Sequence, residues 1–109
     1  MEKFQELFDL VFSSIITPAN LLENAKLDNY DYVNYSKSKD GLVVAMKCSM
    51  ERGIKREFLY NFDKQDKLQT VIMISDQDSE VVFDRMKEID NLKNEILKER
   101  QLTLIDIAG

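Results

Sequence analysis

Residues 41–62, GLVVAMKCSMERGIKREFLYNF, contain the pattern that decides the fold. Alternate residues from Leu42 to Met50 are apolar, which is the period of a β-strand with one buried face. A turn at residues 51–53 follows, and the next apolar set is Ile54, Phe58, Tyr60 and Phe62. So short a connection predicts two neighbouring antiparallel strands.

Two further strands are predicted on either side of this hairpin. Residues 30–35 are rich in aromatic and β-branched side chains, and the Asp40-Gly41 pair that follows is a strong hairpin signal. After a polar turn at residues 63–67, the alternation resumes with Leu68, Thr70, Ile72 and Ile74 as the expected core face. The middle of the chain is therefore predicted to be a four-stranded antiparallel β-meander.

A pair of helices is predicted before the meander. Phe4, Leu7, Phe8, Val11 and Ile15 recur at helical spacing in the first. Thr17-Pro18 then begins a second helix over about 18–26, with Thr17 as N-cap and proline at the first helical position. Ile16 and Leu21 have the spacing of a hydrophobic staple across this cap.

A long helix is predicted after the meander. Residues 75–78 supply capping side chains and acidic charge for its start, and the apolar stripe ends near Arg100. The stripe consists of Val82, Met86, Ile89, Leu92, Ile96 and Leu97. The tail, residues 102–107, has the composition of a short additional strand. The whole chain, 1–109, is thus predicted to be a single α+β domain.

The second face of the predicted sheet is partly apolar, which requires a second cover. The residues concerned are Val43, Ala45, Leu59, Val71 and Met73. Two arrangements would bury them. In the favoured one the N-terminal helices cover one face and the long helix covers the other. The alternative is a homodimer, joined through the sheet face or the tail.

Several classes of catalytic and metal site lack the residues that they need. The chain contains no histidine, one cysteine and three isolated glycines, so a Ser-His or Cys-His nucleophile, a zinc site and a phosphate-binding loop are not expected. The acidic run at 76–80 lacks the glycine and the closing glutamate of a calcium loop, because Val81 and Lys87 stand at those positions. We therefore expect no enzyme, no cofactor and no metal.

The cysteine count and the N-terminus bear on the compartment. Cys48 is the single cysteine, which excludes an intrachain disulfide, and it lies on the apolar face of its strand. Glu6 and Asp9 interrupt any apolar region of a signal peptide. These features predict a cytoplasmic protein.

Charge is unevenly distributed along the chain, whose net charge is −5. Residues 37–56 have a local balance of +4, whereas residues 76–90 have a balance of −4. The simpler interpretation is solvated polar faces, with lysines that protect sheet edges from aggregation. The functional interpretation is a pair of docking surfaces that steer a partner.

Two functions follow from this charge pattern. The first is a non-catalytic protein-binding protein, in its narrow form a small acidic inhibitor of the kind that phages direct against host nucleic-acid-binding or defence proteins. Its expected binding residues are Asp76, Asp78, Glu80, Asp84, Glu88 and Asp90. The alternative is a module that binds single-stranded nucleic acid through the basic hairpin 37–56. Its expected residues are Lys47, Arg52, Lys55, Arg56, Tyr32 and Tyr35.

Overall fold

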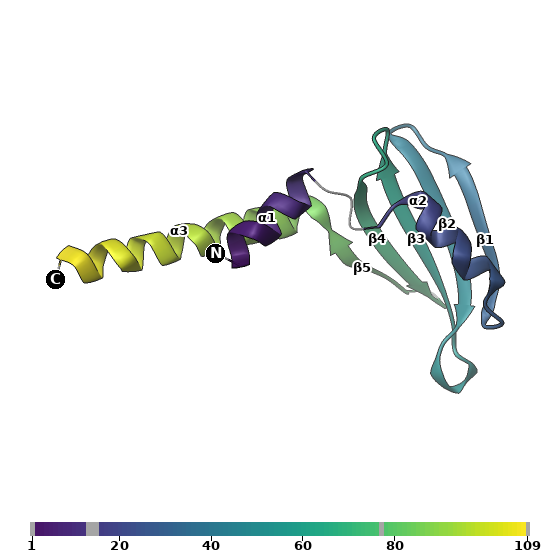
Figure 1. Ribbon diagram of the computed structural model, residues 1–109. Helices are drawn as coiled ribbons and strands as arrows, with labels where there is room; N and C mark the ends of the chain where they lie inside the picture. Colours follow the sequence, from purple (N-terminus) through teal and green to yellow (C-terminus); the bar gives the residue numbers. More distant parts are fainter. Residues whose placement is uncertain (1, 13–15, 77, 109) are drawn as a thin grey trace.

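A five-stranded antiparallel sheet, with helices before and after it in the chain, makes up the fold (Figure 1). The computed structural model describes residues 2–12, 16–76 and 78–108. The strands lie in chain order: β1 (Tyr30–Lys37), β2 (Gly41–Ser49), β3 (Lys55–Asp63), β4 (Leu68–Ser75) and β5 (Asp78–Asp84). The α-helices are α1 (Glu2–Phe12), α2 (Pro18–Leu21) and α3 (Arg85–Ala108), and two short 3-10 helices are η1 (Leu22–Lys26) and η2 (Glu51–Gly53). The α+β class is confirmed, but the prediction of four strands is wrong.

The extra strand replaces the predicted start of the long helix. Residues 78–84 pair with β4 as β5, and α3 begins only at Arg85. The segment holds the run Val81-Val82-Phe83, whose β-branched and aromatic side chains favour a strand. Asp84 ends the strand and caps the helix, because its Oδ1 accepts a hydrogen bond from the backbone N–H of Lys87 at 3.3 Å.

The predicted C-terminal strand is also wrong, because residues 102–107 belong to α3. Their strand-like composition is outweighed by continuation from a helix that has already formed, since each added residue brings one more backbone hydrogen bond without a new nucleation cost. No proline or glycine interrupts α3 before its last residue, Ala108.

The N-terminal helix pair is confirmed, with altered lengths. Within the described residues α1 ends at Phe12, and Ile15 of its predicted stripe lies outside them. The second helix continues from α2 into η1. The backbone N–H of Thr17 donates to Oδ1 of Asn20 at 2.8 Å, which fixes the first turn behind Pro18.

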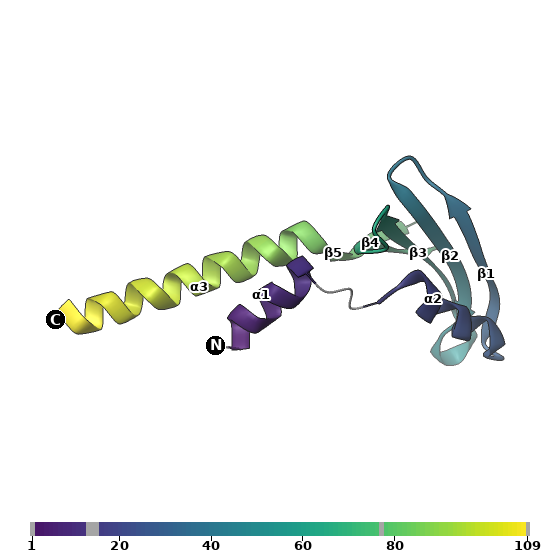
Figure 2. The ribbon, with the colours of Figure 1, turned by 45° about the horizontal axis from the view of Figure 1, so that its top comes forward.

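The main core lies on one face of the sheet, where α2 covers it (Figures 1 and 2). Its buried members are Leu21, Val44, Met46, Phe62, Leu68 and Val71. The predicted core faces are confirmed from Leu42 to Cys48 in β2 and from Phe58 to Phe62 in β3. Met50 and Ile54, predicted on the same faces, lie outside the strands and are 47% and 48% exposed, so their placement in the core is wrong.

The phase predicted for β4 is wrong. Val71 pairs with Tyr60, and Met73 pairs with Phe58, so both lie on the core face. Ile72 lies on the other face. At the register shift beside Phe62, β4 has one residue more than β3. Leu68 and Val71 are therefore both buried although they are three positions apart.

The long helix does not cover the second face of the sheet, contrary to the favoured arrangement. It leaves the sheet beyond β5 and runs antiparallel to α1 (Figures 1 and 2). We call α1 and α3 together the helical arm, and residues 16–84 the sheet region. The radius of gyration is 18.0 Å, against about 13 Å for a compact domain of this length. The molecule is therefore elongated, measuring 59 × 33 × 23 Å.

No described helix packs over the second face of the sheet (Figure 2). Register places Val43, Ala45, Leu59 and Ile72 on this face, and all four are half-buried between their neighbours. Among the described helices, none is long and apolar enough to cross a membrane.

Candidate protein-binding site

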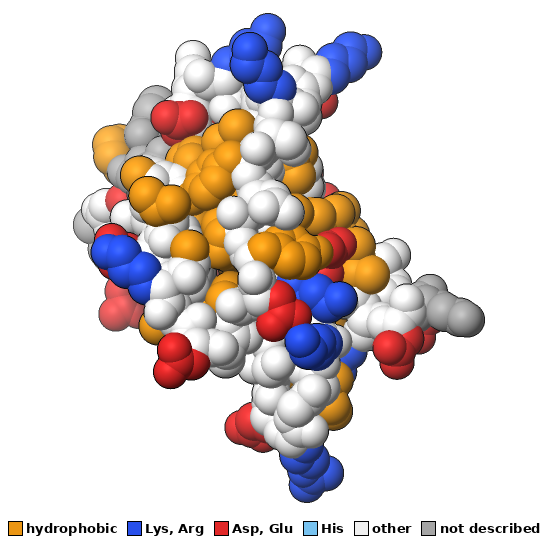
Figure 3. Space-filling model, turned by 90° about the vertical axis from the view of Figure 1, so that its right-hand side faces the viewer, with side chains coloured by type: hydrophobic (Ala, Val, Ile, Leu, Met, Phe, Trp, Pro, Cys, Tyr) orange, Lys and Arg blue, Asp and Glu red, His pale blue; other side chains and the backbone are white. Residues whose placement is uncertain are grey.

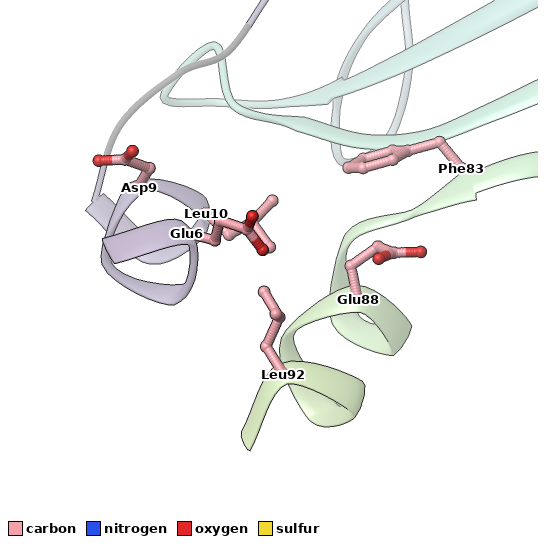
Figure 4. Close-up of a pocket in the computed structure, with 6 residues that line it drawn as sticks. All are labelled: Glu6, Asp9, Leu10, Phe83, Glu88 and Leu92. Atoms are coloured by element: carbon pink, nitrogen blue, oxygen red, sulfur yellow. The ribbon is translucent and has the colours of Figure 1, made fainter. Parts of the chain in front are cut away.

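A pocket of about 370 Å³ opens where the helical arm meets the sheet region (Figure 4). We call it the junction pocket. Two helices and the last strand contribute to it, which brings together positions from both ends of the chain. Its lining consists of Glu6, Asp9, Leu10, Phe83, Glu88 and Leu92.

Apolar side chains form the floor of the junction pocket. Leu10 of α1 and Leu92 of α3 are buried against each other and against Ile89, and this cluster holds the two helices together. Phe83, at the end of β5, packs on this cluster and also on the main core. A register shift in β5 leaves Val82 as the extra residue and sets Phe83 opposite Val71, on the core face.

Three acidic residues, which we call the rim, line the junction pocket beside this floor, although the side chain of Asp9 points away from Phe83 and Glu88 in Figure 4. Glu6 and Asp9 lie one turn apart on α1, and Glu88 lies in the first turn of α3, across the pocket (Figure 4). Asp9 accepts a hydrogen bond from Nε2 of Gln5 at 3.0 Å. Among the ion pairs formed by described residues, none includes Glu6, Asp9 or Glu88. The rim therefore offers negative charge that the rest of the described chain does not neutralise by direct contact.

Arg85 is the basic residue that contacts α1 beside this pocket. Its Nε donates a hydrogen bond to the backbone oxygen of Leu10 at 2.8 Å. That oxygen lies in the last turn of α1, where a helix has free carbonyl groups and a partial negative charge. Arg85 therefore helps to fix α1 against the start of α3 and so sets the width of the pocket.

The acidic residues predicted as a binding surface do not lie together at one helix start. Asp76 occupies the turn before β5, and Asp78 and Glu80 lie along β5 itself. Asp84 caps α3, and Asp90 is exposed on it. Of the predicted acidic set, only Glu88 lines the junction pocket.

The basic and aromatic residues of the alternative site are separated by the sheet. Register places Tyr32 and Lys47 on the open face, whereas Tyr35 and Arg56 lie on the core face. Arg52 lies in the turn after β2, with a positive φ of 63°. The structure thus distributes these six predicted residues over two faces and a turn rather than gathering them. Figure 3 shows basic side chains from the top to the bottom of that view, around a central group of apolar ones.

Several of the same side chains already have partners within the chain. The hydroxyl of Tyr32 donates to Glu57, and this hydrogen bond raises the pKa of the tyrosine. The hydroxyl of Tyr35 donates to the backbone oxygen of Pro18 at 2.7 Å, and Nζ of Lys55 lies 2.5 Å from Oδ2 of Asp31. These contacts hold the edge of the sheet together and reduce the number of groups free to bind bases or phosphates.

Sequence reasoning missed Glu6 and Asp9 as site residues. Their spacing of three, with Leu10 four positions after Glu6, places acids beside an apolar residue on one helix and could have been noticed. The sequence does not reveal the direction in which α3 leaves the sheet. This direction places Glu88 opposite Glu6 and Asp9.

Searches against protein-family models, curated proteins and solved structures find no match.

Proposed function

We propose that this chain is a non-catalytic protein that binds a basic protein partner through the junction pocket. One observation supports the proposal above all others: the apolar side chains of Leu10, Phe83 and Leu92 line one pocket together with three acidic residues. A surface pocket with this composition suits a side chain that is apolar along its length and cationic at its tip.

Arginine and lysine have this amphipathic form. The methylene stem of either side chain would lie on Leu10 and Leu92, while its charged head would reach Glu6 or Glu88. A guanidinium group would in addition stack on the ring of Phe83. The net charge of −5 favours the approach of a basic surface from a distance.

In its narrower form the proposal is an inhibitor of a nucleic-acid-binding or defence protein. The groove of such a partner binds phosphates with lysine and arginine, and carboxylates on an acidic protein can occupy the same positions. Glu6, Asp9 and Glu88 would make this contact. We rank nucleic-acid binding by the hairpin 37–56 lower, because its residues are divided between two faces.

A defined peptide titration tests the proposal. The probes are short labelled peptides in which arginine alternates with leucine, compared with matched peptides that alternate glutamate with leucine or arginine with serine. We expect only the arginine–leucine peptide to bind. In ¹⁵N spectra its addition should shift the signals of Leu10, Phe83 and Leu92 more than those of the sheet.

The double variant Glu6→Gln/Glu88→Gln should weaken this binding by at least about tenfold, because two charge-assisted contacts are lost. Its matched control is Asp28→Asn/Glu51→Gln, which removes the same number of charges from exposed turns and should change binding by less than about twofold. If both double variants weakened peptide binding equally, net charge alone would explain the effect and the proposal would be contradicted. Shifts confined to the face of Lys47 and Lys55 would contradict it as well.

A further inference from the structure

The helical arm contains a second surface that the junction pocket does not use. Helix α3 has 24 residues and α1 has 11, so their lengths are about 36 Å and 16 Å. Helix α1 packs on the side of α3 that carries Ile89 and Leu92, and its Leu7 lies beside a groove that reaches Leu97. Much of α3 is therefore left without a neighbour among the described elements.

Four exposed residues of α3 form a seam along a different side of the helix. Met86, Asp90, Lys93 and Leu97 are separated by four, three and four positions, which is the spacing of the core positions of a coiled coil. Met86 and Leu97 are 57% and 56% exposed, and Asp90 and Lys93 are exposed too. At about 100° per residue, Met86 and Leu97 point within about 20° of the same direction.

This seam is complementary to itself when it is reversed. If two copies of α3 lie antiparallel, with the centre of the pair between residues 91 and 92, Met86 of one copy faces Leu97 of the other. In the same register Asp90 faces Lys93. The four layers are then two apolar pairs at the ends and two opposite-charge pairs in the middle, which is how antiparallel coiled coils match their core positions.

We infer that two copies of this chain associate through an antiparallel pairing of α3 along Met86, Asp90, Lys93 and Leu97. A groove of about 270 Å³ beside the seam supports this assignment. Leu7, Ile96 and Leu97 line it on the apolar side. The Met86 side chain of the second copy would enter this groove, and methionine suits an irregular gap because its side chain is unbranched and flexible.

The charged middle layers determine the register rather than the strength of the pair. A polar pair at a core position of a coiled coil typically costs stability and excludes the registers that would leave it unmatched. Sliding one helix by a heptad would set Asp90 opposite Arg100 and Lys93 opposite Leu97, which leaves Lys93 without an acid. The junction pocket stays open in this pair, because Glu88 is about 200° around the helix from Met86.

A charge exchange tests the pairing. Sedimentation equilibrium from micromolar to millimolar concentration should show a monomer–dimer equilibrium for the natural chain. Asp90→Lys and Lys93→Asp should each weaken dimerisation by at least about a hundredfold, because each places like charges opposite one another in two layers. The double variant Asp90→Lys/Lys93→Asp should restore the dimer, since every layer is matched again.

A matched control and a crosslink complete the test. Asp28→Lys makes the same charge change on an exposed turn and should leave dimerisation unchanged. Met86→Cys/Leu97→Cys should form a disulfide-linked dimer far faster than either single variant, because the cysteines face each other only in this register. Helical content from circular dichroism shows that each variant is folded. A natural chain that stays monomeric at millimolar concentration would overturn the inference, and so would a dimer that neither charge reversal affects.

Discussion

The sheet region and the helical arm are stabilised in different ways. In the sheet region, four side chains are almost completely removed from water: Val44, Met46, Cys48 and Phe62. In the arm, the buried cluster consists of Leu10, Ile89 and Leu92, which are 6–9% exposed. Lys3 of α1 also forms ion pairs with Glu95 and Glu99 of α3, and all three side chains are at least 41% exposed.

This difference indicates that the two regions unfold at different free energies. Hydrophobic stabilisation grows with buried apolar area, and exposed ion pairs add little. The arm should therefore open in local fluctuations that leave the sheet intact. Phe83 packs on both clusters, so it couples the two regions. A binding pocket at such a junction would respond to a change in either region.

The largest expected effect comes from Phe62→Ala. Phe62 is 2% exposed, and its removal leaves a cavity in the main core. We expect a loss of about 3–5 kcal/mol in the free energy of unfolding, measured by urea denaturation. Because the sheet supports Phe83, amide exchange in the arm should accelerate as well. A variant in which exchange accelerates only in the sheet would show that the arm is stable without it.

A smaller and more local effect is expected from Leu92→Ala. Leu92 lies between α1 and α3, and its truncation should cost about 2–3 kcal/mol. Hydrogen exchange should accelerate in α1 and α3, while the slowest amides of β2 and β3 keep their rates. The conservative change Leu92→Met nearly keeps the side-chain volume and serves as the control. Equal acceleration in the arm and in the sheet would mean that the chain unfolds as one unit.

The sequence predicted the part of the fold that depends on neighbours in the chain. Every second residue is apolar from Leu42 to Met50 and from Phe58 to Phe62, and a short turn joins the two segments, so the hairpin and most of its core face were predictable. The boundary between β5 and α3 was not, because acids at 78–84 suit a helix start as well as an exposed edge strand. The phase of β4 depended on a register shift that leaves no mark in the alternation of residues 68–74.

The candidate site was predictable only in part. Glu88 was expected in a binding surface because it follows a run of acids, and it lines the junction pocket. Glu6 and Asp9 come from the other end of the chain. Their approach depends on the packing of Leu10 against Ile89 and Leu92, which is a tertiary contact about 80 residues apart in sequence. Local patterns do not specify such a contact.

The smallest expected effect on stability comes from single carboxylates, one in each region, and it depends on pH. In the sheet region, burial alone would raise the pKa of Asp63, but hydrogen bonds from the backbone N–H groups of Lys67 and Gln65, together with the charges of Arg85 and Lys67, lower it. In the arm, the hydrogen bond and charge of Lys3 lower the pKa of Glu99. Each acid therefore stabilises its region fully above its unfolded pKa, about 3.9 for Asp and 4.3 for Glu, and this contribution is lost as pH falls through the folded pKa.

Salt should separate the two contributions. Asp63→Asn should cost about 1 kcal/mol at neutral pH. A neutral amide oxygen accepts the two backbone bonds to Oδ1, at 2.8 and 3.0 Å, more weakly than a carboxylate does, and the amide NH2 group cannot accept the bond that Nε2 of Gln69 donates to Oδ2 at 3.0 Å. The difference from the natural chain should shrink as pH falls below about 3.9 and through the lowered folded pKa of Asp63. It should persist in high salt, since these bonds are short and local. Glu99→Gln should accelerate exchange only in the arm, and high salt should abolish its effect, because the pair with Lys3 is exposed and screened. The effects of both substitutions are measured by urea denaturation and amide exchange, each at two pH values and two salt concentrations. If the effect of Asp63→Asn disappears in salt as that of Glu99→Gln does, the turn at residues 63–67 is held by long-range charge rather than by its hydrogen bonds.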